Sequence, residues 1–289
     1  MPVVSRVRSA VSKMGGFHAL SARRPVSPAG RPVRPDKRSG VAVWRRGTTA
    51  LAALATAAIS ASLLLSDTAT VADGTDAPGV TGVGSTTAYS ATATTAVALA
   101  KPSGTTAGDV LVVSITADLD PALVSVPSGW VPIVNALLIN SSSSSGARVF
   151  AYWHAVGPSD PASYAWTLSK DVMWGAGVTA YRGVNNATPL DGAVATAVNT
   201  SYKATSITVP GITTASNGAM LIGGVGFDSR DPAASPPNGW AEQWEAAGGQ
   251  IAEQADMTQA AAGASGDAIW TFNTAKAVAA WRTALKPAR

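Results

Sequence analysis

The sequence predicts an all-β fold, and three observations point to it. No stretch after Leu65 has the 3.6-residue apolar period of an amphipathic helix. Short runs rich in Val, Ile, Thr and aromatic residues instead alternate with clusters of Gly, Pro, Ser and Asn, a pattern typical of strands and turns. These runs also repeat along the chain. We therefore expect a two-sheet antiparallel sandwich, jelly-roll-like, built from two pseudo-repeats of about five strands each.

The internal repeat is carried by residues at fixed spacing. Gly108, Asp118, Pro127, Gly129 and Trp130 return at identical spacing as Gly218, Asp228, Pro237, Gly239 and Trp240. In a second block, Trp166, Thr167, Thr179 and Arg182 correspond to Trp270, Thr271, Thr283 and Lys286. Such self-similarity indicates two copies of one supersecondary unit. The predicted sandwich covers residues 89–289, with repeat halves at about 94–184 and 205–287.

The two halves predict matching strands, separated by short loops rich in Gly and Pro. The expected pairs are 95–101 with 206–209, 109–117 with 219–227, 148–156 with 250–257, 163–168 with 268–273, and 177–184 with 278–285. The runs 109–117 and 219–227 are mostly apolar, so we expect them to be central strands.

The N-terminal third differs in composition from the rest. Residues 1–46 hold 11 of the 21 Lys and Arg and one acidic residue, so we expect a disordered basic segment. A start codon assigned too far upstream, with initiation near Val41 or Val43, would explain its length, and a basic arm touching anionic lipid or nucleic acid is the alternative. The remaining chain is net acidic, so the pI of 9.5 does not favour nucleic-acid binding by the folded part.

An apolar segment follows this basic region. Residues 48–65 carry no charge and are preceded by Arg45 and Arg46, which predicts a signal peptide over 47–72 cleaved after Ala72. The alternatives are an uncleaved single-pass anchor with its N-terminus in the cytoplasm, and a twin-arginine signal. Residues 73–88 then form a linker. The chain is therefore expected to be secreted or held at the cell surface.

The aromatic residues divide into two groups. Four of the nine tryptophans (Trp130, Trp166, Trp240 and Trp270) recur in both halves and are expected to pack in the core. The unpaired aromatics are candidates for an exposed platform on which a sugar ring could stack: Trp174, Trp244, Tyr202 and Trp153.

Carboxylates give two further candidates. Asp118 with Asp120, and Asp228 with Asp231, end equivalent strands and are weak Ca²⁺ candidates, although capping of a turn explains them as well. The only glutamates are Glu242, Glu245 and Glu253, which fall within twelve residues. They could act as the paired acids of a glycosidase, or they could belong to a solvated surface loop.

Other reactive residues are scarce. The chain has no cysteine, which excludes disulfides, thiolate zinc sites and cysteine nucleophiles. His154 is the only histidine of the predicted domain, and no Gly-x-Ser-x-Gly motif accompanies it. A partly buried strand histidine is therefore favoured over a Ser-His-Asp triad, and a multi-histidine metal site is excluded. We expect no cofactor and no resident metal.

Several short runs carry a resemblance to a known kind of module. Ala-Tyr-Arg-Gly-Val at 180–184, Thr-Pro-Leu-Asp at 188–191, the strand opening at 108–113 and the turn at 127–130 resemble a β-sandwich module of secreted actinobacterial proteins and phage tail proteins. The resemblance covers about residues 86–287 and implies a non-catalytic extracellular module. We expect it to bind glycan, cell wall or a surface protein. The alternatives are a structural or assembly role, such as a phage-tail-like or envelope spacer, and a polysaccharide-active enzyme that uses Glu242 and Glu245.

Overall fold

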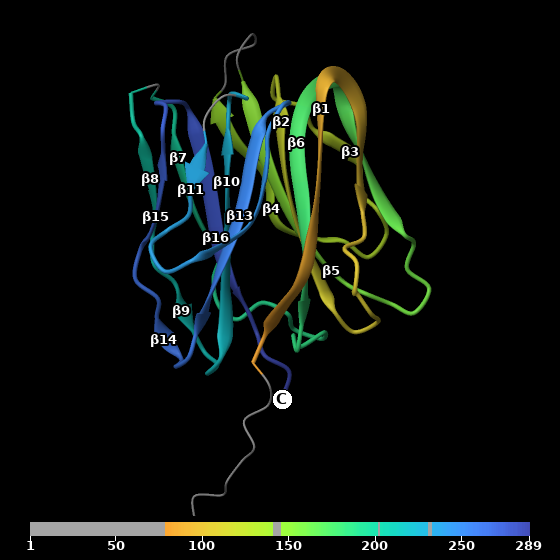
Figure 1. Cartoon of the computed structure of the whole chain (residues 1–289), viewed down its shortest axis with the longest axis vertical. Helices are drawn as coiled ribbons and strands as arrows, with labels where there is room; N and C mark the ends of the chain where they lie inside the picture. Colours follow the sequence, from red (N-terminus) through yellow and green to blue (C-terminus); the bar gives the residue numbers. More distant parts are fainter. Residues whose placement is uncertain (1–78, 141–145, 202, 231–232) are drawn as a thin grey trace, which may run out of the picture. The chain divides into compact units, whose positions relative to one another are not determined.

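The computed structural model describes residues 79–140, 146–201, 203–230 and 233–289. Every helix-or-strand element in these ranges is a β-strand, which confirms the all-β prediction (Figure 1). No helix in the described part is long and apolar enough to cross a membrane. The basic segment predicted over 1–46, the signal or anchor over 47–72 and most of the linker lie outside the described residues.

The first half of the domain consists of strands β1 to β6. Their bounds are β1 Thr81–Ala100, β2 Val110–Asp118, β3 Leu123–Ser125, β4 Val131–Asn140, β5 Ala147–Ala155 and β6 Ser163–Arg182. They form an antiparallel sheet in the order β1-β6-β2-β5-β4, with β3 paired to β6. Strands β1 and β6 pair along most of their 20-residue lengths, with register shifts between Ser90 and Ala96.

The second half consists of strands β7 to β16. Their bounds are β7 Ala195–Asn199, β8 Ser206–Val209, β9 Thr213–Thr214, β10 Ala219–Phe227, β11 Ala234–Ser235, β12 Ala241–Ala246, β13 Ile251–Gln259, β14 Gly263–Ala264, β15 Ala268–Phe272 and β16 Val278–Leu285. Within the described ranges they form three sheets, with orders β12-β13-β10-β16-β7, β11-β15-β8 and β14-β9.

The two halves pair their strands in the same order. Strands β4, β5 and β2 neighbour one another as β12, β13 and β10 do. The long β6 corresponds to β15 and β16 together, and the long β1 to β8 and β7, because Val97 faces Trp166 as Ile207 faces Trp270. The described residues therefore contain four sheets, where the sequence predicted two.

The reason for the extra sheets is that each half closes a core of its own. The first-half core includes Leu111, Ile115 and Phe150, packed under Trp130 and Trp166. The second-half core lies between β10, β13 and β16 on one side and β8 and β15 on the other. The large sheets carry apolar side chains on both faces. One face packs in the core of its own half, and the other can pack against the other half, which the hydrophobic effect favours.

A third cluster, the inter-half core, joins the two large sheets. Val110 and Val112 of β2 pack there with Met220 and Ile222 of β10. The sheets approach closely at two glycines: a Cβ at Gly177 would overlap the Trp244 ring, and one at Gly226 would overlap Thr116. Alternate residues of β2 thus face two different cores, which explains why this strand reads as a continuous apolar run.

The structure corrects several sequence-based boundaries. Residues 81–88, predicted as linker, belong to β1 and pair with β6. Segments 163–168 and 177–184 were expected as two strands, but the first and most of the second lie in the single strand β6. Short edge strands such as β7 and β11 were not predicted, because segments of five and two residues with mostly small or polar side chains carry little strand signal.

Candidate functional site

The predicted aromatic platform is wrong for two of its members. Trp174 is 5% exposed and packs in the first-half core. Trp244 is 6% exposed, and its indole N–H donates to the Thr179 hydroxyl, 3.1 Å away. Trp153 is half-buried against the inter-half core, and Tyr202 lies outside the described residues. Trp174 fills the first-half core, and Trp244 fills the space between the two large sheets, which their lack of a counterpart in the other half could not reveal.

The tryptophans that recur in both halves pack inside, as predicted. Trp166 and Trp270 are at most 1% exposed, and Trp130 is buried beside Trp166 with ring centroids 4.9 Å apart. Trp240 is partly buried and contacts Trp270 edge to face at 5.6 Å. Equivalent tryptophans therefore occupy equivalent core positions.

The calcium candidates lie at one end of the domain. Burial is the main cause that raises the pKa of Asp118, and the nearby charge of Asp228 adds to it. Asp120 is already paired with Arg148, and Asp231 lies outside the described residues. In the described ranges no group of three or more metal-ligating His, Asp or Glu side chains is arranged to hold an ion.

The three glutamates, in contrast, are brought together. Glu245 of β12 lies opposite Glu253 of β13, and Glu242 lies opposite Ala255 on the same pair of strands. A β-bulge at Gln243 shifts the register between Glu242 and Trp244. Residues three apart in a regular strand point to opposite faces, so this bulge is what turns Glu242 and Glu245 to the same face.

Glu253 is the buried member of this carboxylate cluster. The residue is 0% exposed, and neither carboxyl oxygen accepts a hydrogen bond of normal geometry. Burial, followed by the charges of Glu242 and Glu245, raises its pKa from 4.5 to about 8, although the indole of Trp270 lies close enough to oppose this slightly. At neutral pH the Glu253 side chain is therefore a neutral carboxylic acid.

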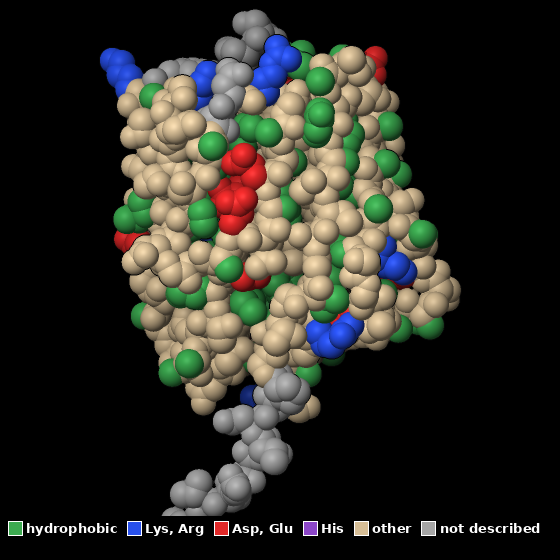
Figure 2. Space-filling model, viewed as in Figure 1, with side chains coloured by type: hydrophobic (Ala, Val, Ile, Leu, Met, Phe, Trp, Pro, Cys, Tyr) green, Lys and Arg blue, Asp and Glu red, His purple; other side chains and the backbone are tan. Residues whose placement is uncertain are grey.

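Glu245 connects the cluster to the neighbouring sheet. Its Oε2 accepts a hydrogen bond of 2.8 Å from the backbone N–H of Ala234 in β11. Burial raises the pKa of Glu245, and the charge of Glu242 raises it further. Glu242 itself is exposed. Figure 2 shows a patch of acidic side chains on the face in view, apart from the Lys and Arg side chains nearer its margins. The cluster thus runs from solvent into the second-half core.

Glu253 is not placed to act on a glycosidic bond, and a catalytic role for Glu242 with Glu245 stays a prediction. An acid with a raised pKa is what such chemistry requires, but its oxygen must touch the glycosidic bond. Glu253 has no exposed surface, and Glu245 is engaged with β11. The sequence located the acidic cluster, whereas the bulge that orients it left no signal in residue types.

His154 lies in a network of its own in the first half. Its Nε2 is 2.6 Å from the Asp160 carboxylate, and its Nδ1 is 3.0 Å from the Gly129 carbonyl oxygen. Tyr164 donates to the same Asp160 oxygen, and the His154 ring stacks on Trp130 at 5.3 Å. Both ring nitrogens are engaged, so His154 pins the loop at 157–160 onto the core, as the prediction of a partly buried strand histidine implies.

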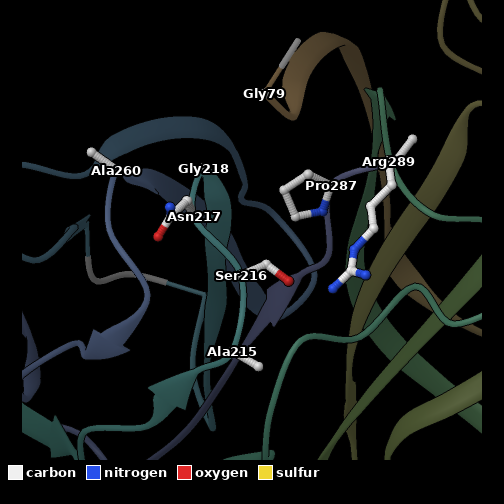
Figure 3. Close-up of a pocket in the computed structure, with 9 residues that line it drawn as sticks. Gly79, Ala215, Ser216, Asn217, Gly218, Ala260, Pro287 and Arg289 are labelled. Carbon is white, nitrogen blue, oxygen red and sulfur yellow. The ribbon is translucent and has the colours of Figure 1, made fainter. Parts of the chain in front are cut away.

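A cavity of about 520 Å³ lies at the end of the domain where Gly79 leads into β1 (Figure 3). Its walls are formed mainly by small residues of the 215–218 turn, together with Pro287 and Arg289. The backbone N–H groups of Ala215 and Ser216 already donate to Asp191. The cavity therefore presents mostly small side chains, with Arg289 as its charged group.

Comparison with known proteins gives no family for this chain. No protein-family model matches it, and no curated protein or solved structure is significantly similar to it.

Proposed function

We propose that the chain is a secreted or cell-surface, non-catalytic module that binds a glycan, a cell-wall component or a surface protein. The proposed fold is a duplicated jelly-roll-like sandwich, with each half one copy of the same unit. The single observation that carries the proposal is the polarity of the domain. The described chain begins at Gly79, at one end of the domain, and the loops after β2 and β10 lie at the opposite end (Figure 1).

Strand directions support this polarity. A Cβ placed on Gly218 would lie 3.8 Å from the Gly79 Cα, so the two glycines are neighbours; Gly218 precedes β10, and β10 therefore runs away from the entry point. Strand β2 runs the same way, since Gly226 faces Thr116 near the ends of both strands. The far end carries Asp118, Asp228 and the Asp120–Arg148 pair. In sandwich domains the loops at one end are a common binding surface.

The far loops replace the aromatic platform as the proposed contact region. Trp174 and Trp244 are buried, so stacking of a sugar on them is not part of the proposal. Arg230 is exposed next to Asp118, whereas Arg289 is exposed beside the entry-side cavity. These two arginines provide a matched pair of probes.

The test is retention of the full chain on isolated cell walls and on a panel of insoluble polysaccharides. We expect retention that soluble ligand competes, that Arg230→Glu weakens severalfold, and that Arg289→Glu leaves unchanged. If only Arg289→Glu abolishes retention, the binding surface lies at the Gly79 end, which contradicts the proposed contact through the far loops. No retention on any surface would favour the structural or assembly role, which light scattering of the same preparation addresses.

A further inference from the structure

We propose that the carboxylate cluster of Glu242, Glu245 and Glu253 is a pH-responsive element: neutral Glu253 keeps the β11–β12 edge of the second half closed, and ionised Glu253 loosens it. This inference rests on the geometry of the second half and is independent of the proposed function. Its basis is a fully buried carboxyl with two unpartnered oxygens, placed directly opposite a second carboxyl.

The surroundings of Glu253 offer little to an anion. Its neighbours on β10 and β12 are Val225 and Glu245, and apart from Arg282 the residues of β8 and β16 in this core are apolar. Strand β15 contributes the Trp270 indole N–H, which has no hydrogen-bond partner of normal geometry. A buried carboxylate without a cation or several donors is costly, so the neutral form is the one that fits.

The described cation of this core, Arg282, has both terminal nitrogens engaged away from Glu253, whereas its buried Nε has no hydrogen-bond partner among the described residues. Arg282 of β16 is 1% exposed and donates to the Gly266 carbonyl and the Ser265 hydroxyl, each at 2.7 Å. It also lies over the Trp240 ring, 5.4 Å from the centroid. Arg282 lies opposite Gly223 of β10, two residues along from Val225, which neighbours Glu253. The charges that act on Glu253 are those of Glu242 and Glu245, so ionised Glu253 would face two negative groups, with the Arg282 terminal nitrogens directed toward Ser265 and Gly266.

The part that yields should be the edge of the two sheets. In backbone pairing, β12 has one neighbour, β13, and β11 has one, β15, although Trp244 of β12 also donates to Thr179 of β6. The hydrogen bond from Ala234 to Glu245 joins these edges. Repulsion between Glu253 and Glu245 would pull on that bond, whereas β10 and β16 are held on both sides. Edge strands open more easily than central ones because fewer contacts hold them.

The sign of the effect follows from proton binding. Closed Glu253 keeps its proton up to about pH 8, whereas an opened, solvated glutamate releases it near 4.5. Between these pH values the opened state binds fewer protons than the closed state. The equilibrium constant for opening therefore increases by up to about tenfold per pH unit and becomes constant above about pH 8.

Hydrogen–deuterium exchange of the full chain tests this. Rates at pH 6 and pH 9 are corrected for intrinsic chemical exchange, and peptides covering β11 and β12 are compared with those covering β3 and β4. We expect the opening equilibrium of β11–β12 to rise by more than about tenfold, with little change in β3–β4. Equal corrected rates at both pH values would overturn the proposal.

Two variants distinguish opening caused by ionisation of Glu253 from a general loss of stability at high pH. Glu253→Gln keeps the shape without the charge and should abolish the rise in β11–β12 opening. Glu245→Gln removes the opposing carboxylate and should move the levelling-off to a lower pH. If β11–β12 opening still increases with pH in a folded Glu253→Gln protein, the proposal is contradicted. It is also contradicted if the pH dependence of opening in Glu245→Gln is the same as in the wild type. If Glu253→Gln does not fold, the wild-type and Glu245→Gln profiles decide.

Discussion

The two halves of this domain share one pattern of strand pairing and differ in what they place inside it. Counted from Gly108 and Gly218, Ile115 of β2 corresponds to Val225 of β10. Ile115 pairs with Phe150, and Val225 pairs with Glu253. The first half therefore has an aromatic ring at the position where the second half has a carboxyl group.

The side chains that pack on the equivalent residues Trp130 and Trp240 also differ between the halves. In the first half, His154 stacks on Trp130 and is tied to Asp160. In the second half, Arg282 lies over Trp240, and burial lowers its pKa. The comparison teaches that backbone pairing and a few large apolar side chains define the framework, while interior positions can carry ionisable groups at a cost in stability.

The largest expected effect comes from making the halves alike. Phe150→Glu would place an unpartnered carboxyl in the first-half core and remove a buried ring. We expect a loss of about 4 kcal/mol or more in the free energy of unfolding, measured by denaturant titration at pH 7. Phe150→Leu, which keeps the site apolar, should cost about 1 kcal/mol. A loss below 1 kcal/mol for Phe150→Glu would show that the first half tolerates charge equally well.

The next effect concerns the junction between the halves. Gly177→Ala would drive a methyl group into the Trp244 ring, so we expect a loss of about 3 kcal/mol in unfolding free energy. Gly157→Ala is the control, because its new Cβ would lie 3.6 Å from the nearest atom, the Asp160 carboxylate. Equal stability of both variants would mean that the sheets separate at little cost.

The contribution of Asp160, which holds His154 against Trp130, to the free energy of unfolding should decrease in acid. Burial alone would raise the pKa of Asp160, but hydrogen bonds from His154, Gly157 and Tyr164 outweigh it and lower the pKa below 3.8. The ionised carboxylate therefore stabilises the fold above pH 4, and this contribution disappears as the pH falls further. Asp160→Asn should cost about 1–2 kcal/mol at pH 7 and much less at pH 3. A cost that does not change with pH would contradict the ionic role.

The smallest effect is expected on the outer faces. Ile269 is 49% exposed on β15, and Val124 is 63% exposed in β3. Ile269→Thr and Val124→Thr should each change the unfolding free energy by less than about 0.5 kcal/mol. A clearly larger loss in thermal stability for one of them would show that another surface covers that half.

Much of the fold follows from residue patterns in the sequence. The apolar runs that became β2 and β10, the repeated tryptophans in the cores and the absence of helical periodicity in the described part are local features, and they predicted an all-β domain. The same patterns located the cluster of glutamates and the solitary His154, since residue types and spacing are legible without coordinates.

The tertiary structure decided which side chains meet. Burial of Trp244 depends on a second sheet stacked across Gly177, and Trp174 is buried on the opposite face of β6 in the first-half core; no local pattern encodes these contacts. The single-residue bulge at Gln243 turns Glu242 and Glu245 toward Glu253, although spacing alone would place the first two on opposite faces. Register and stacking arise from contacts between residues far apart in the chain. The sequence by itself therefore determined the all-β class, the central strands and the candidate groups, and only packing decided the remaining strands and the exposure and protonation of those groups.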